Sequence, residues 1–427
     1  MRQILGAVAI GMLATAGGAD WPQFRGPDGT GVATGATPPI KWTVKDGVKW
    51  KTPLPGPGSS SPIVTGDCVF ATCYSGYGVD AANPGSVEKL TRHLVCINRT
   101  TGRLQWKADV AAVTPEDPYR ADITEHGYAS STPVTDGEAV YVFFGKSGVL
   151  AFDLDGKKLW QQSVGTQSDI RGWGSSASPI LYKNLVIVNA ASEDRAIVAL
   201  DKKSGKQVWK AEGRRLSLSF STPALVKAGS RTDLVVAMPG EVWGLNPDTG
   251  KLVWIATINL TGNVCPAVIP GDGVAYITGG FGTVGSVAVR AGGSGDVSKS
   301  HVVWSTRTSS YIPTPVLDGS RIYCVTEDGI ALCLKADTGE VVYKERLAVM
   351  AGGKRSRPYY ASTVLADDRL YVVSRRAGVF VLKAGDGFEQ LQQNPPLDES
   401  DFNATPAAIG KQLFLRSNTF LYCLEAP

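Results

Sequence analysis

The sequence predicts an all-β protein, an eight-bladed β-propeller in which each blade contains four antiparallel strands. Three observations predict this fold: a turn motif that recurs along the chain, a second recurring motif that begins each unit, and chain ends that complement one another. The 427 residues include 49 glycines and many β-branched residues, and no long segment has helical periodicity.

The first motif is a tight turn between two strands, the second of which carries an aromatic residue. In residues 199–209, Asp201 can bond the turn backbone and Gly205 can take the positive φ that the turn requires. Equivalent copies are residues 96–106, 244–254, 333–343 with Tyr343 in place of tryptophan, and 151–160, which is one residue shorter. Such self-similarity indicates a repeat architecture.

The second motif is a small polar residue before proline and a short apolar strand. It recurs about every 45 residues after a longer first interval, which with four strands per unit is typical of propeller blades. We place these anchors at Ser61-Pro62, Thr132-Pro133, Ser178-Pro179, Thr222-Pro223, Cys265-Pro266, Thr314-Pro315 and Thr405-Pro406, with Ser362-Thr363 as the copy that lacks proline.

The two ends of the chain predict how the ring closes. The last unit stops at its third strand, residues 420–425, whereas residues 48–54 resemble an orphan fourth strand that carries Trp50. Pairing these two segments would complete blade eight and remove its open edges. We therefore assign residues 20–39 to a lead segment and residues 40–427 to the propeller.

Residues 1–19 have the pattern of a secretory signal peptide. Arg2 precedes an apolar run from Ile4 to Leu13, which is too short to span a membrane, and small residues lead to Ala19. We expect cleavage before Asp20, with cleavage after Ala16 as the alternative, and a mature protein that is periplasmic or extracellular. We expect no transmembrane segment, and a formal charge of +4 gives no support for a nucleic-acid partner. We expect a monomer.

The seven cysteines mostly read as core residues. Cys96, Cys333 and Cys423 occupy the repeat position that other units fill with alanine or glycine, a role that a free thiol can serve. One disulfide is plausible, between Cys324 and Cys333, if Asp328-Gly329 forms a two-residue hairpin turn.

Insertions indicate which face of the ring is elaborated. Long loops at residues 76–92, 111–127 and 347–358 would emerge on one face, together with the segments that enter each anchor strand. The glycine- and serine-rich insertion at residues 292–300 would lie on the opposite face, and we predict a flexible loop there.

The turn-to-tryptophan pattern resembles the tryptophan-docking motif of pyrroloquinoline quinone (PQQ) type propellers. That superfamily includes quinoprotein alcohol dehydrogenases and the non-catalytic outer-membrane assembly factor BamB, and this compact chain is closer in type to the latter. Residues 21–27, WPQFRGP, further resemble the start of exported planctomycete-type PQQ-like proteins. The resemblance implies tryptophans that pack between blades, with Tyr343 and Leu391 as weakened copies; the tryptophans are Trp50, Trp106, Trp160, Trp209, Trp254 and Trp304.

The resemblance also defines what a catalytic member would need. A quinoprotein dehydrogenase holds a flat tricarboxylate cofactor and a calcium ion, with an aspartate as base. Such enzymes often have two adjacent cysteines, which this chain lacks, and most of its Asn and Asp residues occupy turns. We predict no catalytic set, no metal and no cofactor; PQQ with calcium is the alternative.

The segments that enter the anchor strands are the expected binding face, because they surround the mouth of the channel. They alternate basic and aromatic residues, which suits an anionic or planar ligand or an acidic peptide. The competing interpretation is that the aromatics pack between blades and the arginines pair locally. The candidate ligand-binding residues are His126, Tyr128, Arg171, Trp173, Tyr311, Arg357, Tyr359 and Tyr360.

These observations predict an exported binding or scaffold protein with a protein or small-molecule partner. The first alternative is a PQQ-dependent dehydrogenase that oxidises an alcohol or sugar. The second is a BamB-like assembly factor that binds envelope proteins by strand addition.

Overall fold

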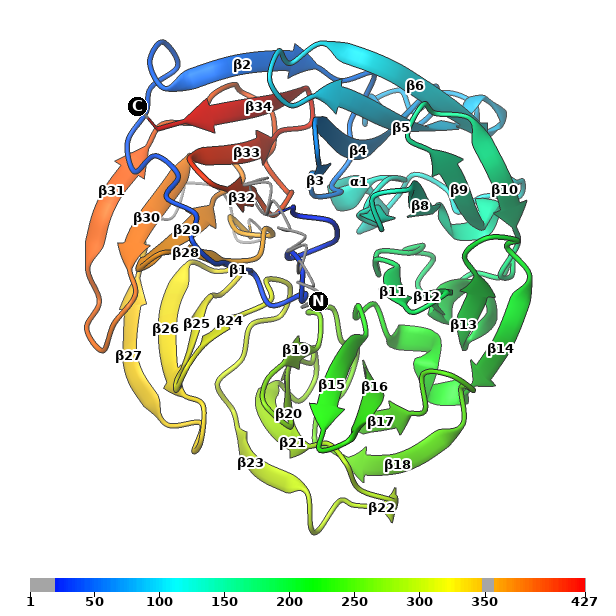
Figure 1. Ribbon diagram of the computed structural model, residues 1–427, viewed down its shortest axis with the longest axis vertical. Helices are drawn as coiled ribbons and strands as arrows, with labels where there is room; N and C mark the ends of the chain where they lie inside the picture. Colours follow the sequence, from blue (N-terminus) through cyan, green and yellow to red (C-terminus); the bar gives the residue numbers. More distant parts are fainter. Residues whose placement is uncertain (1–19, 348–356, 427) are drawn as a thin grey trace, which may run out of the picture.

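The computed structural model describes residues 20–347 and 357–426, which form a ring of radially stacked sheets around a central channel (Figure 1). Over these residues the strands group into eight sheets, each with four antiparallel strands ordered from the channel outward. The predicted eight-bladed propeller is confirmed. Among the described residues, no helix has the length and apolar character needed to cross a membrane.

The first four blades follow the chain without interruption. Blade one contains β3 (Ile63–Thr65), β4 (Cys68–Ser75), β5 (Thr91–Asn98) and β6 (Leu104–Ala111). Blade two contains β7 (Val134–Thr135), β8 (Ala139–Phe143), β9 (Val149–Asp153) and β10 (Lys158–Gln162). Blade three contains β11 (Ile180–Tyr182), β12 (Leu185–Ala190), β13 (Ala196–Asp201) and β14 (Gln207–Glu212). Blade four contains β15 (Ala224–Ala228), β16 (Arg231–Met238), β17 (Glu241–Leu245) and β18 (Leu252–Thr257).

The other four blades follow in chain order. Blade five contains β19 (Ile269–Pro270), β20 (Val274–Gly279), β21 (Gly285–Arg290) and β23 (Val302–Thr306). Blade six contains β24 (Val316–Asp318), β25 (Arg321–Val325), β26 (Ile330–Lys335) and β27 (Val341–Arg346). Blade seven contains β28 (Val364–Ala366), β29 (Arg369–Val373), β30 (Val379–Lys383) and β31 (Gln390–Asn394). Blade eight contains β32 (Ala407–Ile409), β33 (Gln412–Arg416) and β34 (Phe420–Glu425).

The ring closes as the chain ends predict. Strand β2 (Val48–Pro53) pairs antiparallel with β34, and Trp50 lies opposite Cys423. The N-terminal strand thus supplies the outer strand of blade eight, side by side with the C-terminal strand in Figure 1. The pairing with β2 covers the edge of β34 that would otherwise be open.

Five of the predicted tryptophans dock against the next blade by one repeated contact. Each lies opposite a small residue at a β-bulge, as Trp209 lies opposite Ala199, and donates its indole N–H to a turn carbonyl of the following blade. The acceptors are the carbonyls of Arg99 for Trp50 (2.8 Å), Leu154 for Trp106 (2.8 Å), Lys202 for Trp160 (2.8 Å), Pro247 for Trp209 (3.0 Å) and Ala336 for Trp304 (2.8 Å).

Trp254 differs, because the insertion at residues 292–300 lies beside it. This insertion is not the flexible loop that its composition predicts: β22 (Gly295–Asp296) pairs parallel with β18 and becomes a fifth strand of blade four. The indole of Trp254 donates instead to the Asp233 carboxylate of its own blade at 2.7 Å. The insertion therefore replaces the usual docking contact between blades four and five.

Two other register predictions need correction. In blade seven the position opposite Val381 is Gln392, so Leu391 is the exposed bulge residue and not a weakened docking residue. In blade six Cys324 lies opposite Leu332, because the turn is one residue longer than a two-residue hairpin. That extra residue turns Cys333 to the other face of the sheet, and the structure shows both cysteines as free thiols. Cys96, Cys333 and Cys423 are fully buried core residues, as predicted.

The lead segment crosses the channel, which the sequence did not predict (Figure 1). It begins beside blade one, where Trp21 pairs with Val64, and continues to blade seven, where β1 (Val32–Ala33) pairs parallel with β28. Between these points Arg25 is buried and donates to the carbonyls of Thr314 (3.1 Å) and Pro315 (2.6 Å) in blade six. Burial lowers the pKa of the Arg25 guanidinium to about 9, and the carbonyls that surround it offset part of that cost.

Candidate functional site

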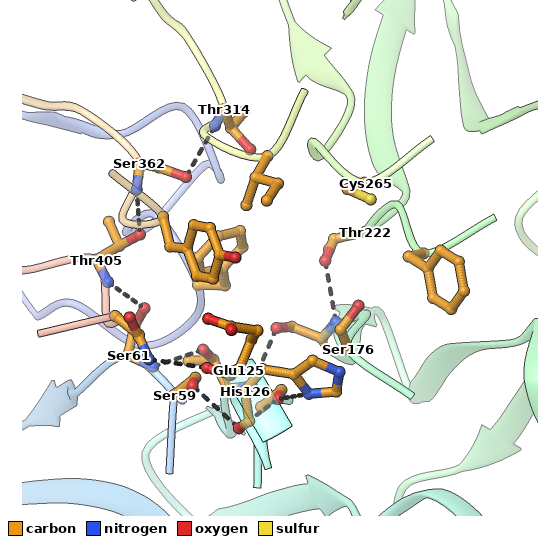
Figure 2. Close-up of a pocket in the computed structure, with 18 of the residues that line it drawn as sticks. Ser59, Ser61, Glu125, His126, Ser176, Thr222, Cys265, Thr314, Ser362 and Thr405 are labelled. Carbon is orange, nitrogen blue, oxygen red and sulfur yellow. Dashed lines mark hydrogen bonds between the residues drawn. The ribbon is translucent and has the colours of Figure 1, made fainter. Parts of the chain in front are cut away.

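A cavity of ≈ 190 Å³ opens at the mouth of the channel, on the face that carries the segments entering each blade (Figure 2). Because a water molecule occupies about 30 Å³ of liquid, this space could hold roughly six waters or a small ligand. Phe24 of the lead segment lines this cavity and also a second hollow of ≈ 640 Å³, as Thr222 does.

The floor of the cavity is a ring of anchor hydroxyls. Each anchor amide donates to the hydroxyl of the next blade, as Ser61 N–H does to Thr132 Oγ1 at 2.9 Å. The described anchors that accept such a bond are Thr132, Ser178, Thr222, Thr314, Ser362, Thr405 and Ser61, with donor–acceptor distances of 2.9–3.1 Å. All seven line the cavity. Because each oxygen accepts an amide hydrogen, its own hydroxyl hydrogen is available to a ligand.

Blade five interrupts this ring. Its anchor amide is that of Ala267, which donates to Thr314 Oγ1 at 3.0 Å, so the anchor is Ala267-Val268 and not Cys265-Pro266 as predicted from the sequence. Cys265 lies two residues earlier and lines the cavity with its thiol. Burial raises the pKa of that thiol to about 11, so it stays protonated and is a poor nucleophile.

One wall of the cavity is the short helix α1 (Ile123–His126) and its neighbours. His126 Nδ1 lies 2.9 Å from Ser130 Oγ, which gives its own hydrogen to the His126 carbonyl, so Nδ1 is the donor. Burial lowers the pKa of His126, and the neutral ring leaves Nε2 as an acceptor. Asn403 donates to the Glu125 carbonyl at 3.1 Å, and its buried Oδ1 has no hydrogen-bond partner within the described chain.

The opposite wall is aromatic, and arginines already cover several of its rings. Trp173 packs on Phe220 with ring centroids 5.5 Å apart, and Arg171 stacks over Trp173 at 4.8 Å. Arg357 stacks over Tyr311 at 4.9 Å, and Arg375 stacks over Tyr360 at 4.5 Å. Arg375 also pairs with Glu125 at 2.7 Å, which joins the two walls.

The structure gathers most, though not all, of the residues predicted to bind a ligand. The cavity is lined by His126, Trp173, Tyr311, Arg357 and Tyr360. Tyr128 is packed edge-on against Tyr74, and Tyr359 is fully buried beside Phe380. Arg171 does not line the cavity and stacks behind it, over Trp173 and Phe281. Whether these residues bind a ligand remains a prediction.

Sequence reasoning missed the anchor hydroxyls, Asn403 and Phe24. The anchors were visible as repeats, but the direction of their hydroxyls depends on the neighbouring blade. Phe24 carries no sequence signal for this position, because its placement depends on a lead segment that crosses the ring.

The charge of the lining does not fit a tricarboxylate cofactor. Among the described lining residues, Arg357 is the one arginine or lysine, and the lining also includes the carboxylates of Asp122 and Glu125. PQQ would bring three further carboxylates to this set, and unpaired buried charges are costly. Nor does the described part of the chain contain a cluster of three or more His, Cys, Asp or Glu residues that could hold a metal ion.

Comparisons with known proteins identify the relationship. The family model described as outer membrane protein assembly factor BamB matches residues 30–169 and 91–345, which together span most of the chain. The chain belongs to the BamB family. BamB of Yersinia pestis is 23% identical over 339 residues, covering 75% of this chain and 76% of that protein.

Quinoprotein dehydrogenases are also relatives of this BamB-family chain, but over shorter stretches. The quinoprotein alcohol dehydrogenase PedH of Pseudomonas putida is 30% identical over 140 residues, which are 31% of this chain and 23% of that enzyme. Among solved structures, BamB of Moraxella catarrhalis superposes with a TM-score of 0.62 at 13% identity, covering 89% of this chain and 97% of that one. A europium-containing methanol dehydrogenase gives 0.64 at 10% identity, covering 96% and 99%. These structural matches show the fold alone.

Proposed function

We propose that this protein is a binding propeller, exported to the cell envelope, whose channel-mouth cavity holds a partner without catalysing a reaction on it. The single observation that supports it best is the cavity itself: aromatic walls, a floor of hydroxyls, and the buried acceptor Asn403 Oδ1, which has no partner among the described residues. A buried polar atom without a partner is costly, and a ligand that donates to it would recover that cost.

The chemistry of the lining limits the classes of ligand that the cavity can bind. Among the described lining residues Arg357 is the one arginine or lysine, Glu125 is already paired with Arg375, and Asp122 adds a negative charge, so the cavity offers little to an anion, which was one of the ligands expected from the sequence. The hydroxyl ring, Asn403 and neutral His126 instead suit an uncharged group that both donates and accepts hydrogen bonds and has one flat face for the aromatic wall. An amide, hydroxyl or aromatic side chain from a protein loop meets these requirements.

The family suggests what such a partner would be. By analogy with the relatives named as outer-membrane protein assembly factors, we propose that the partner is a β-barrel protein of the outer membrane or a component that assembles it. This finer proposal rests on family membership together with the cavity.

A photo-cross-linking experiment tests it. Trp173, on the cavity wall, is replaced by p-benzoylphenylalanine in the host cell, and Leu159, half-exposed on the outer strand β10, is replaced in a matched control. We expect cross-links from position 173, and not from position 159, to an outer-membrane β-barrel protein or its assembly machinery. The absence of such products from position 173, or equal products from both positions, would contradict the proposal.

A second measurement addresses the dehydrogenase alternative. Purified protein is titrated with PQQ and calcium while tryptophan fluorescence is followed, and dye-linked oxidation of alcohols and sugars is measured. We expect no saturable binding at micromolar PQQ and no turnover. Saturable binding that Arg357→Ala weakens, with turnover, would overturn the non-catalytic assignment.

A further inference from the structure

Three side chains on blade one lie in a linear hydrogen-bonded chain that the channel-mouth site does not use. His93 on β5 lies between Ser75 on β4 and Asp109 on β6: Ser75 Oγ is 2.8 Å from His93 Nε2, and His93 Nδ1 is 2.7 Å from Asp109 Oδ1. The sequence did not reveal this set, because the three residues are far apart in the chain and only the register of the strands brings them together.

The register explains the geometry. Asp109 is directly opposite His93 across the β5–β6 pair, and Ser75 is diagonal to His93 across the β4–β5 pair. Neighbours of this kind on one face of a sheet lie within reach of each other. Cys73 and Val95 share a core cluster with Phe414 and Tyr422, so this face of blade one is turned toward blade eight.

The hydrogen bonds assign the tautomer of the imidazole. Asp109 can only accept when ionised, so His93 Nδ1 carries the hydrogen and Nε2 is the lone-pair acceptor for the Ser75 hydroxyl. The ring is 3% exposed, and burial lowers the pKa of His93 although the Asp109 carboxylate opposes that shift. The neutral ring is the form that can take a proton from serine.

We propose that Ser75, His93 and Asp109 form a nucleophile, a general base and an orienting acid that cleave small, unhindered carboxylic esters. Nucleophile activation by a histidine whose other nitrogen is held by a carboxylate is the arrangement that serine hydrolases of unrelated folds share. This activity is separate from the channel-mouth cavity and does not depend on the function proposed for it.

The position of Ser75 defines the class of substrate. Ser75 is half-buried at the end of β4, and the next residue, Gly76, is exposed, so a carbonyl group can approach from solvent. The imidazole beneath is buried, which favours a small acyl group. An ester is the expected substrate because an alcohol leaves more readily than an amine.

The proposed reaction is balanced without a co-reactant other than water. Ser75 Oγ bonds to the acyl carbon as its proton passes to His93 Nε2, and the departing alcohol takes that proton when the ester C–O bond breaks. Water then attacks the acyl-serine, gives a proton to His93, and releases the acid as Ser75 recovers its hydrogen. The net reaction is ester plus water to acid plus alcohol.

Another serine–histidine pair, Ser130 with His126, provides an internal control. Ser130 Oγ lies 2.9 Å from His126 Nδ1, but it gives its hydrogen to the His126 carbonyl at 3.2 Å and is therefore the acceptor from the ring. A serine in that state is not activated. Ser130 and Ser75 thus differ in the direction of the hydrogen bond and not in the presence of a histidine.

Covalent labelling tests the proposal on the full mature chain. The probe is a biotinylated fluorophosphonate, whose phosphorus bonds to an activated serine oxygen as fluoride leaves, and the modified residue is located by peptide mass spectrometry. We expect labelling at Ser75 and none at Ser130, its loss in Ser75→Ala, and no change in Ser130→Ala. His93→Gln should slow labelling about a hundredfold or more.

Asp109 is a positioning residue, and its variants separate orientation from folding. Its side chain is 52% exposed, so Asp109→Asn should leave the thermal midpoint nearly unchanged while it slows labelling about tenfold or more. Asp109→Glu keeps a carboxylate at this position and should therefore be labelled faster than Asp109→Asn but more slowly than the native protein. Hydrolysis of 4-nitrophenyl acetate, with an acetyl group trapped on Ser75, would support the acyl pathway. Labelling spread over several serines, or a Ser75 rate that neither His93→Gln nor Asp109→Asn lowers, would overturn the proposal.

Discussion

Neighbouring blades are joined by one set of contacts at the regular junctions of the ring and by a different set between blades four and five. At a regular junction, such as that between blades three and four, a tryptophan reaches across to a turn carbonyl and an anchor amide bonds to the next hydroxyl. At the four–five junction both contacts are replaced: Trp254 bonds to Asp233 of its own blade, and Ala267 stands where a hydroxyl is expected. The repeat therefore tolerates loss of its signature contacts where a buried carboxylate and an added strand compensate.

Removal of the Asp233 carboxylate should lower the free energy of unfolding more than any of the other substitutions predicted below. Asp233 is 1% exposed and accepts hydrogen bonds from Trp254 Nε1 (2.7 Å), Gly292 N (2.9 Å) and Arg231 Nε (2.8 Å). Asp233→Ala leaves these donors without an acceptor, and we expect the free energy of unfolding to fall by about 3–5 kcal/mol. Urea denaturation measures this change.

The matched control is Asp201→Ala, which removes a turn carboxylate that accepts from Ser204 N (2.8 Å) at a regular junction. We expect a loss of about 1 kcal/mol there, since water can replace the bond. Equal losses in the two variants would show that the four–five junction does not depend on Asp233.

Glu193 provides a second buried carboxylate for comparison, near the junction of blades two and three. It lies on α2 (Ala191–Asp194), accepts from Ser175 Oγ, and has no partner for Oε2 within the described chain. Burial raises the pKa of Glu193 to about 7, above the ordinary value near 4.5 that the unfolded chain would have. Between these two pH values the folded state binds the extra proton, so stability is greatest at low pH and falls as pH rises through 7.

This linkage predicts a loss of about 3 kcal/mol between pH 5 and pH 8 from this one group. Glu193→Gln, which is neutral at every pH, should remove that part of the pH dependence and should be the more stable protein at pH 8. Thermal midpoints of both proteins across this range measure it. Parallel pH profiles for the two proteins would show that the carboxyl does not titrate as inferred.

The close approach of a docking tryptophan to its turn can be tested with two glycines. Gly205 and Gly229 both have positive φ, 70° and 63°, but a Cβ at Gly205 would lie 2.7 Å from the Trp160 ring, whereas one at Gly229 would meet nothing within 4 Å. We expect Gly205→Ala to cost about 2 kcal/mol and Gly229→Ala about 1 kcal/mol in the free energy of unfolding. If the two costs are equal, backbone strain alone accounts for both.

The smallest expected effect comes from repairing the hydroxyl ring. Ala267→Ser restores an acceptor at the interrupted position and should raise the free energy of unfolding by up to about 1 kcal/mol. Thr132→Ala removes an existing acceptor and should lower it by about the same amount. A stabilising effect of both substitutions would contradict the role assigned to the ring.

Features set by local pattern were predictable, and so was the closure of the ring, whereas features set by turn length or by contacts between distant segments were not. Residues 48–54 have a strand pattern with no partner nearby, so their pairing with the unfinished last blade followed from the sequence alone. The Cys324–Cys333 pairing failed because the length of one turn decides the facing of a whole strand. Nothing in the repeat pattern indicated that Arg25 would be buried against blade six. The alignment of Ser75, His93 and Asp109 likewise depends on register across three strands.

The path of the lead segment has a consequence for the order in which the protein can fold. Residues 21–53 make native contacts with β28 and β34, which lie far later in the sequence. Residues 21–53 therefore cannot complete these contacts until those strands have been synthesised, and the closure of the ring depends on contacts of long sequence separation. Until residues 407–425 have been synthesised, blade eight lacks its inner three strands, and residues 21–53 cannot make all of their native contacts. A chain of this design should fold slowly, and as a unit rather than blade by blade.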